Sequence, residues 1–306
     1  MTRTPRLAAH VIVGDRDEPF LGAMLASLEG AVGTVLVNDN SPGPTRHEEV
    51  FATSSFARAG RLFIDRTPFT GFAQARNVCL ALHEEHDAGD WALIVDTDEV
   101  HGPALARIAA RLPLVPRRYH HIDAYMRHFF MSFDWYTSIE RRKMLFRFRP
   151  GLRWEGTVHE RLVGLDDVRL CLPYVYATYG SALGLRRFAA KGRLYSSLGA
   201  PGETIAEDEV DRVDPAAYFA PVYPRLLRFR GEHPEPARAA IERLRRQLAT
   251  EHALTERLAR AQPMHVRFAN AIARLNYEQR WRARALHPLA RALVAPRGSP
   301  PRSVPR

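Results

Sequence analysis

The chain has 306 residues, of which 46% are hydrophobic and 25% are charged. This length and composition predict a globular core, built as one large domain or as one domain with an appendage. The two cysteines, Cys79 and Cys171, exclude a disulfide-based scaffold and indicate a reducing compartment. No apolar run approaches the roughly 20 residues that span a bilayer, and no signal peptide is recognisable. We therefore expect a soluble, cytoplasmic protein.

The positive charge of the chain is concentrated in its C-terminal part. Residues 1–182 hold 21 Lys and Arg against 22 Asp and Glu, a net charge of −1, whereas residues 183–306 hold 23 against 12, a net charge of +11. A basic region of this kind is typical of proteins that bind nucleic acid, anionic lipid or acidic substrates. A general bias toward arginine is the alternative explanation, because Lys143 and Lys191 are the only lysines.

The first half of the chain alternates short apolar runs with helical patterns. The apolar runs lie at 7–13, 32–37, 61–65 and 91–95. Their β-branched and apolar residues predict buried strands. Helical spacing of apolar residues extends from Phe20 to Leu28, and another helix is predicted from Gly71 to about His86. This alternation predicts an α/β fold, with a mainly parallel central sheet and helices on both faces.

Polar residues follow each of these four runs. The polar segments lie at 14–18, 38–43, 65–71 and 96–99. Because the carboxyl ends of parallel strands meet at one edge of a sheet, we expect these segments to converge there, where α/β proteins bind their ligands. The sequence therefore predicts one ligand site, built from segments that are far apart in the chain.

The fourth run ends in three carboxylates, Asp96, Asp98 and Glu99. In extended backbone Asp96 and Asp98 point the same way, and two like charges side by side need a cation or hydrogen bonds to compensate them. A divalent metal held by carboxylate oxygens, with a nucleotide diphosphate supplying further ligands, would do so. The alternative is that both are turn and helix-capping residues, because Gly102, Pro103 and an Ala/Leu-rich helix follow.

The pattern changes after Pro116. Aromatic and β-branched segments, which predict further strands, lie at 120–133, 143–148 and 169–177. From Leu183 onward the chain is predominantly helical, with apolar stripes through 237–258 and 266–289. We expect an α/β domain at 1–182, a basic helical extension at 183–295 and a disordered Pro/Arg-rich tail at 296–306.

Five motifs, in this order, resemble those of the GT-A-fold glycosyltransferases of family 2 type. The segments are Val11 to Leu21, Leu36-Val37-Asn38-Asp39-Asn40-Ser41, Gly71-Phe72-Ala73-Gln74-Ala75-Arg76-Asn77, Val95-Asp96-Thr97-Asp98-Glu99-Val100 and Gly156-Thr157-Val158-His159-Glu160. They look like the first strand with its loop, the nucleotide loop, a helix start, the Asp-x-Asp signature and the Gly-x-Val-His-Glu element of one subgroup. The resemblance covers residues 8–182 and implies that the domain at 1–182 is the catalytic, nucleotide-sugar-binding domain. Beyond it only Lys191-Gly192-Arg193-Leu194-Tyr195 is similar.

The resemblance implies a metal-dependent, inverting glycosyltransferase of hexosyltransferase type, with Mn²⁺ or Mg²⁺ as its cofactor. The donor would be a nucleotide-diphosphate sugar, with a UDP-sugar favoured by its frequency in the family. The acceptor would be a glycan, a lipid-linked molecule or a protein, with a surface-glycan precursor as the first hypothesis. Diphosphate leaves as the glycosidic bond breaks, and a metal that bridges both phosphates stabilises its charge.

The resemblance also suggests roles for individual residues. Asp98 and Asp96 would hold the metal, and His159 is the candidate for a third ligand from a distant segment. Asp39 would bind the base or ribose, and Asp15 is a weaker candidate for the same contact. Asp39 is equally well explained as a turn former within Asn-Asp-Asn-Ser-Pro-Gly. Arg76 would pair either with the diphosphate or with Asp96.

An inverting transferase needs a general base that takes the proton of the acceptor hydroxyl. The Trp-Gly-x-Glu-Asp stretch of better-known relatives is not found in this sequence. Glu160, Glu155 and Asp134 are the candidates, and Glu160 is favoured by its motif. Alternatively, Glu160 orients His159 as a metal ligand.

Two readings of other classes remain open. One is a basic nucleic-acid-binding protein, although the aromatic and basic residues do not interleave as in a recognised module. The other is a protein that binds nucleotide sugar without turning it over. Separately, the basic C-terminal helices fit peripheral docking to an anionic membrane at its inner face, or they present a solvated helix surface.

Overall fold

The computed structural model describes residues 7–41, 47–201 and 204–266, together with residues 268, 270 and 272. The predicted tail at 296–306 and most of the predicted apolar stripe at 266–289 lie outside these residues. Among the described helices, none combines the length and the apolar composition that crossing a bilayer would take.

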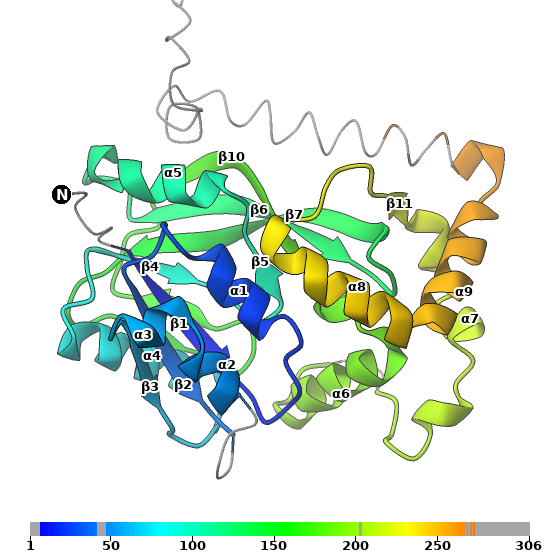
Figure 1. Cartoon of the computed structure of the whole chain (residues 1–306), viewed down its shortest axis with the longest axis horizontal. Helices are drawn as coiled ribbons and strands as arrows, with labels where there is room; N and C mark the ends of the chain where they lie inside the picture. The colour runs from blue at the N-terminus through cyan, green and yellow to red at the C-terminus, as the bar shows by residue number, and fades with distance from the viewer. Residues whose placement is uncertain are drawn as a thin grey trace, which may run out of the picture.

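The first half of the chain forms the parallel part of a central sheet. Its strands are β1 (Leu7–Val13), β2 (Thr34–Asp39), β3 (Leu62–Asp65) and β4 (Trp91–Ile94). They pair in parallel in the order β3-β2-β1-β4, with helices between them in the sequence (Figure 1). All four strands lie where the apolar runs predict them. β1, β2 and β4 are mostly buried, whereas β3, at the edge of the sheet, is only partly buried along its length.

The second half extends the same sheet with both antiparallel and parallel pairs. Its strands are β5 (Glu99–Val100), β6 (His121–Phe129), β7 (Trp135–Arg147), β10 (Arg169–Thr178) and β11 (Leu227–Arg228). β6 and β7 are antiparallel because a short connection through residues 130–134 joins them as a hairpin. β7 also pairs antiparallel with β4, whereas β6 pairs in parallel with β10. The α/β class is therefore confirmed, but the sheet is mixed where a mainly parallel one was expected. Trp135 and Tyr136, expected in a connection, begin β7.

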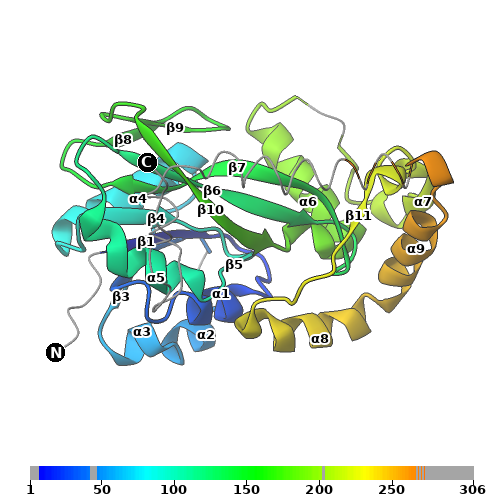
Figure 2. The same cartoon turned by 90° about the horizontal axis from the view of Figure 1, so that it is seen from above.

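Helices cover both faces of the sheet (Figure 2). One face carries α1 (Leu21–Ser27), α2 (Glu48–Ala52), α3 (Ser55–Arg58) and α5 (Ala104–Arg111). The other carries α4 (Phe72–Glu85) and a hairpin of β8 (Arg153–Glu155) and β9 (Arg161–Val163). Alternate residues of β1 divide between the faces: Val11 packs in the core under α1, and Ala8 packs in a smaller cluster with Leu82 of α4.

The chain beyond residue 183 packs onto the sheet rather than standing apart. Its helices are α6 (Gly184–Ser197), α7 (Pro215–Tyr218), α8 (Arg238–Gln247) and α9 (Ala249–Arg260). Five short 3₁₀ turns in the described chain complete the fold, at Leu112–Leu114, Gly180–Ala182, Val210–Arg212, Tyr223–Arg225 and Glu235–Ala237. Ile241 and Leu244 of α8 share a buried cluster with Phe20 and Val100. The stripe predicted through 237–258 is thus two helices, divided at Leu248.

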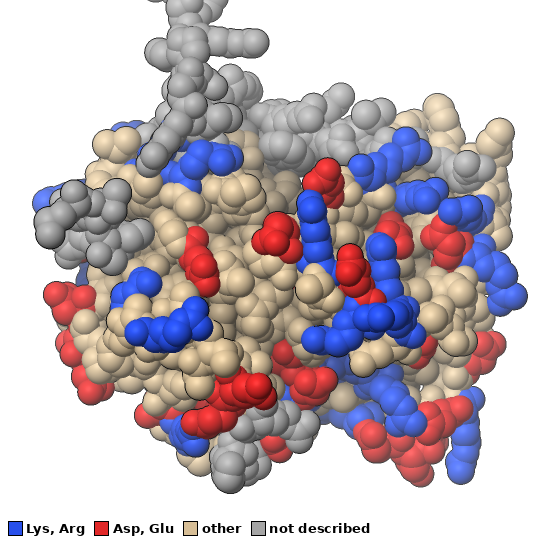
Figure 3. Space-filling model, viewed as in Figure 1, with Lys and Arg blue, Asp and Glu red and all other residues tan. Residues whose placement is uncertain are grey.

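Basic side chains gather over α8 and α9 on the face seen in Figure 3, and acidic side chains interleave with them. Arg238 pairs with Glu232 at 2.7 Å, and Arg245 pairs with Asp134 at the same distance. Part of the positive charge of the C-terminal region is therefore compensated within the fold.

Two buried histidines predict that the fold is sensitive to acid. Nε2 of His10 lies 2.8 Å from Nδ1 of His83, and Nε2 of His83 lies 2.9 Å from the Gly89 carbonyl. Burial lowers the pKa of His83 to about 4 and lowers that of His10 well below its ordinary value. Both rings are therefore neutral in the folded protein near pH 6.

Because these folded-state pKa values are depressed, the stability they support is present above the unfolded pKa of about 6.5 and is lost as the pH falls toward 4. For His83 alone we expect a loss of roughly 2 kcal/mol between pH 7.5 and pH 5. Urea unfolding at the two pH values measures it. Exchange of the exposed His265 for glutamine should leave the pH dependence unchanged, and equal free energies of unfolding at both pH values would contradict the prediction.

Candidate functional site

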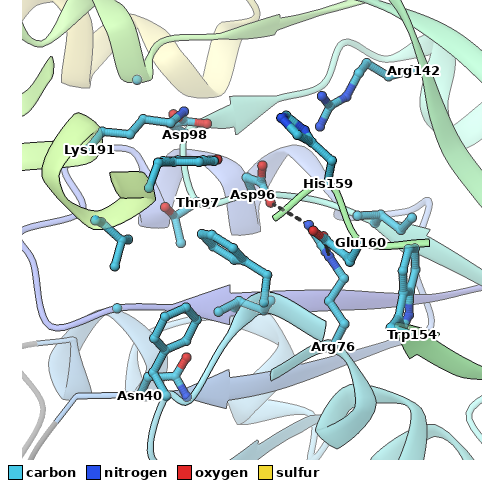
Figure 4. A pocket seen from close by; sticks show the side chains of 18 of the residues that line it. Asn40, Arg76, Asp96, Thr97, Asp98, Arg142, Trp154, His159, Glu160 and Lys191 are labelled. Atoms are coloured by element: carbon cyan, nitrogen blue, oxygen red, sulfur yellow. Dashed lines mark hydrogen bonds and ion pairs between the residues drawn. The ribbon is translucent and has the colours of Figure 1, made fainter. Parts of the chain in front are cut away.

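A cavity of about 720 Å³ opens at the carboxyl ends of the parallel strands (Figure 4). Residues from the loops after β1 and β2, from α4, from the turn after β4, from the β8–β9 hairpin and from α6 line it. The predicted site residues among them are Asp15, Arg76, Asp96, Asp98, His159 and Glu160. The expected convergence of distant polar segments is therefore found, with α6 as an additional wall.

The segment after β4 forms a tight turn. The Glu99 amide donates to the Asp96 carbonyl at 3.0 Å, and the Glu99 carboxylate accepts from the Asp96 amide at 3.2 Å. The turn formation considered for this segment is thus correct, and the extended backbone is not what aligns the two aspartates. Asp96 and Asp98 nevertheless both line the cavity. In the same turn, the Thr97 hydroxyl donates to Glu18 at 2.8 Å and so connects it to the loop after β1.

Asp98 is held by the segment that follows β10. The Thr178 hydroxyl donates to one carboxylate oxygen of Asp98 at 3.2 Å, and the Tyr179 amide donates to the Asp98 carbonyl at 3.0 Å. The other carboxylate oxygen occupies the space that a side chain at Gly180 would need, since an added Cβ would lie 1.9 Å from it. Only glycine at position 180 allows Asp98 this orientation.

Negative charge accumulates around this turn. Glu99 is 4% exposed, and burial, followed by the charges of Asp96 and Asp98, raises its pKa well above the ordinary value. Burial and the neighbouring carboxylates thus disfavour the charged form of Glu99, whereas Asp96 and Asp98 line the cavity.

Arg76 connects the turn to the β8–β9 hairpin. Its guanidinium is 9% exposed, lies 3.5 Å from Asp96 and forms a close ion pair with Glu160. It also lies over the Trp154 ring, 5.5 Å from the ring centroid. Burial lowers the pKa of Arg76, but Asp96 and Glu160 together raise it by more. Of the two predicted roles for Arg76, the structure therefore shows the ion pair with Asp96.

The hairpin presents His159 and Glu160 to the cavity. Two hydrogen bonds between the Asn77 side chain and the Trp154 backbone, of 2.7 and 3.0 Å, fix the hairpin to α4. His159 has a φ of +60°, a conformation rare outside glycine, and its ring lies between Arg142 and Glu160 (Figure 4). Within the described chain, no three His, Cys, Asp or Glu side chains are grouped closely enough to form a metal site by themselves.

Helix α6 forms the wall that sequence reasoning missed. Arg187, Lys191 and Tyr195 recur at every fourth position and line the cavity. Arg187 pairs with Glu18 and donates to the Asp17 carbonyl at 2.7 Å, so that it fixes the loop after β1. The similarity of residues 191–195 to the transferase family was the one sequence signal for this wall.

Three predicted residues do not reach the cavity. Asp39 is fully buried, and its carboxylate accepts from the Ser41 amide at 3.1 Å, as in the turn that its sequence also predicted; Asn40 lines the cavity instead. Asp134 pairs with Arg245 at 2.7 Å beside α8, and Glu155 pairs with Arg153 at 2.6 Å. Both of these carboxylates are held by arginines away from the site.

Carboxylate oxygens that point into a cavity are the ligand type that Mg²⁺ and Mn²⁺ prefer. Asp96 offers a side chain that is 48% exposed, and Asp98 offers a carboxylate whose orientation is fixed by Thr178 and Gly180. These two residues fit a divalent cation that takes its remaining ligands from a bound molecule.

No protein-family model matches the chain, and no curated protein matches its sequence. Among solved structures, the chain is similar to the mannosyltransferase PcManGT from Pyrobaculum calidifontis, in complex with GDP-Man and Mn²⁺, at 15% identity and a TM-score of 0.42 over 96% of this chain and 86% of that one. It is similar to S. aureus TarS 1–349 at 13% identity and a TM-score of 0.37, over 92% and 90% of the two chains. GalNAc-T7 with UDP, GalNAc and Mn²⁺ follows at 12% identity and a TM-score of 0.32, over 55% and 31%.

The space at Gly180 gives a direct test of the site. We expect Gly180→Ala to displace the Asp98 carboxylate, because a methyl group cannot share its position, and to lower the affinity for any ligand that needs Asp98 at least tenfold while the chain stays folded. Gly192→Ala in α6 is the matched control, because nothing lies within 4 Å of its added Cβ. Calorimetric titration of UDP and GDP with Mn²⁺ measures the affinity, and a thermal melt shows whether each variant is folded. Equal affinities in the two variants would refute the role of Gly180.

Proposed function

We propose that this chain is a metal-dependent, inverting glycosyltransferase of hexosyltransferase type that uses a nucleotide-diphosphate sugar. The proposal depends on one observation: all five family-like motifs contribute residues to one cavity, although the nucleotide-loop motif contributes Asn40 alone. Motifs that occurred by chance in an unrelated protein would have no reason to converge in this way. From the resemblance alone, a UDP-sugar is the first donor to test and a surface-glycan precursor is the first acceptor.

In this proposal Asp96 and Asp98 hold a divalent cation, Mn²⁺ or Mg²⁺, and His159 is the candidate for a further ligand. When bound, the cation supplies positive charge to the diphosphate as it leaves. Arg76 keeps Asp96 in place through its ion pair, and Thr178 keeps Asp98 in place through its hydrogen bond. The protein thereby fixes both carboxylates before any ligand arrives.

Glu160 is the proposed general base. The acceptor oxygen forms a bond to the anomeric carbon of the sugar, the bond from that carbon to the diphosphate breaks, and the proton of the acceptor hydroxyl passes to the Glu160 carboxylate. One oxygen of Glu160 contacts Arg76, which orients the carboxylate toward the cavity that it lines. Among the three predicted candidates, Glu160 is the one that lines the cavity.

Calorimetric titration of UDP and GDP, with and without Mn²⁺, tests the proposal. We expect one of the two nucleotides to bind more tightly when the metal is present. Asp98→Ala should lower that affinity at least tenfold, because it removes a carboxylate that would hold the metal. A tenfold loss corresponds to about 1.4 kcal/mol of binding free energy. Absence of binding for both nucleotides under all conditions would refute the proposal.

The role of Glu160 is tested by a pair of variants in the same hairpin. Glu160→Gln should lower kcat by a factor of about 10²–10⁴, because the amide cannot accept the proton, and leave nucleotide affinity close to that of the wild type. Glu155→Gln, whose carboxylate lies outside the cavity and pairs with Arg153, should change neither quantity. The rate is that of sugar transfer to water or to an added acceptor, and it is measured by the nucleotide diphosphate released. An equal kcat in both variants would exclude Glu160 as the base.

A further inference from the structure

Two cations face the Asp96–Asp98 turn from different walls of the cavity. Lys191 comes from α6 on the side of Asp98, and Arg142 comes from β7 on the side of His159 (Figure 4). Neither forms an ion pair with a carboxylate in the part of the chain that the structure describes, although most cations around them do. The contacts that hold Asp96 and Asp98 in place come from Arg76 and Thr178 and do not involve either of these two cations.

Lys191 differs from the other basic residue on its face of α6. Arg187, one turn earlier, is engaged by Glu18 and the Asp17 carbonyl. Lys191 is exposed in the cavity, and its amine lies over the Tyr195 ring, 5.7 Å from the ring centroid. Its charge is therefore positioned by packing and is open to a ligand.

Arg142 is the middle member of a basic triplet on β7. The pairing of β7 with β4 ends at Leu145, opposite Leu93, so residues 141–143 continue past the end of β4. On either side, Arg141 lies 3.3 Å from Asp123, and Lys143 lies 3.3 Å from Asp167. Arg142 alone of the three lacks such a partner among the described residues, and it projects toward Asp96 and Glu99.

Electrostatics agree with this geometry. Partial desolvation lowers the pKa of Lys191, but nearby charges, above all that of Asp98, raise it by more. The pKa of Arg142 is likewise lowered by desolvation and raised further by Asp96 and Glu99. Both side chains stay fully charged at neutral pH, held near the carboxylates without direct ion pairs.

We propose that Lys191 and Arg142 bind the diphosphate of the nucleotide donor from two sides and neutralise part of its charge directly. The inference rests on the function proposed above. A metal held by Asp96 and Asp98 would bring the diphosphate next to those carboxylates, in the cavity that Lys191 and Arg142 also line. Charge-assisted contacts from both sides would then strengthen as the leaving group gains charge, whichever sugar it carries.

This arrangement makes nucleotide binding only partly dependent on the metal. With the metal removed, Lys191 and Arg142 still offer two positive charges to the diphosphate, so a weaker affinity remains. A nucleoside, which has no phosphate, gains nothing from either cation. The number of phosphates on the ligand therefore reports on the two side chains.

Calorimetric titrations on the wild type, Lys191→Met and Arg142→Met test the inference. The ligands are uridine, UMP and UDP, and likewise guanosine, GMP and GDP. Each variant should bind the nucleotide diphosphate at least tenfold more weakly than the wild type in Mn²⁺, and more weakly than the wild type in EDTA, while nucleoside affinity stays unchanged. Lys191→Arg should restore part of the loss. Lys143→Met is the matched control, because Lys143 lines the same cavity but its amine is already paired with Asp167, and it should stay within about twofold of the wild type.

A measurement on the wild type avoids any effect of mutation on folding. Because Lys143 and Lys191 are the only lysines, acylation of each amine can be followed by mass spectrometry. UDP or GDP, whichever binds, should protect Lys191 and leave Lys143 unchanged. Diphosphate binding that is the same in Lys191→Met, Arg142→Met and the wild type, or equal labelling of Lys191 with and without nucleotide, overturns this inference alone. A wild type that binds no nucleotide overturns the proposed function as well.

Discussion

The short crossing from β4 to β5 is the constraint on which the site depends. Five Cα steps join Ile94 to Glu99, which reach at most about 18 Å, yet β7, β6 and β10 lie between the two strands in the sheet order. Four strand spacings in a flat sheet would need about 19 Å, with a fully extended chain. The segment instead contains a turn, so the sheet has to curl around it. Asp96 and Asp98 therefore lie inside the curve, where residues from both halves of the sheet reach them.

Concentrating carboxylates in that position costs free energy, and the structure offsets the cost in several ways. Burial and its two neighbours raise the pKa of Glu99, which disfavours a third negative charge beside Asp96 and Asp98. Arg76 forms ion pairs with Asp96 and Glu160 at the same time. Asp98 accepts a hydrogen bond from Thr178. The carboxylates of Asp96 and Asp98 are thereby held in position at the cavity, and carboxylate oxygens are the ligands that hard divalent cations take.

The sequence predicts the parallel half of this fold well, because buried strands and the polar segments after them are local patterns. It also places Asp96, Asp98, Arg76, His159 and Glu160 in one site, since their motifs are local as well. What it does not predict depends on contacts between distant segments. Asp134 pairs with Arg245 of α8, and no pattern near Asp134 indicates this contact. Asp39, by contrast, closes a local turn on Ser41 that its own sequence also predicted. The antiparallel pairs of β7 with β4 and β6 make the sheet mixed rather than mainly parallel, whereas β6 and β10 pair in parallel.

Gly180 and Lys191 show why the predicted boundary at 182 does not divide the site. Gly180 lies just before that boundary and leaves room for Asp98, and Lys191 lies just after it and faces the same carboxylate. The strand β10 brings the chain to the Asp98 carboxylate, and α6 then leaves from that point along the cavity. A cation nine residues beyond the boundary is therefore positioned by the same backbone that fixes Asp98. The sheet thus provides the negative charge of Asp98, and the first helix of the C-terminal region provides the positive charge of Lys191. Both parts of the chain are needed to form the cavity.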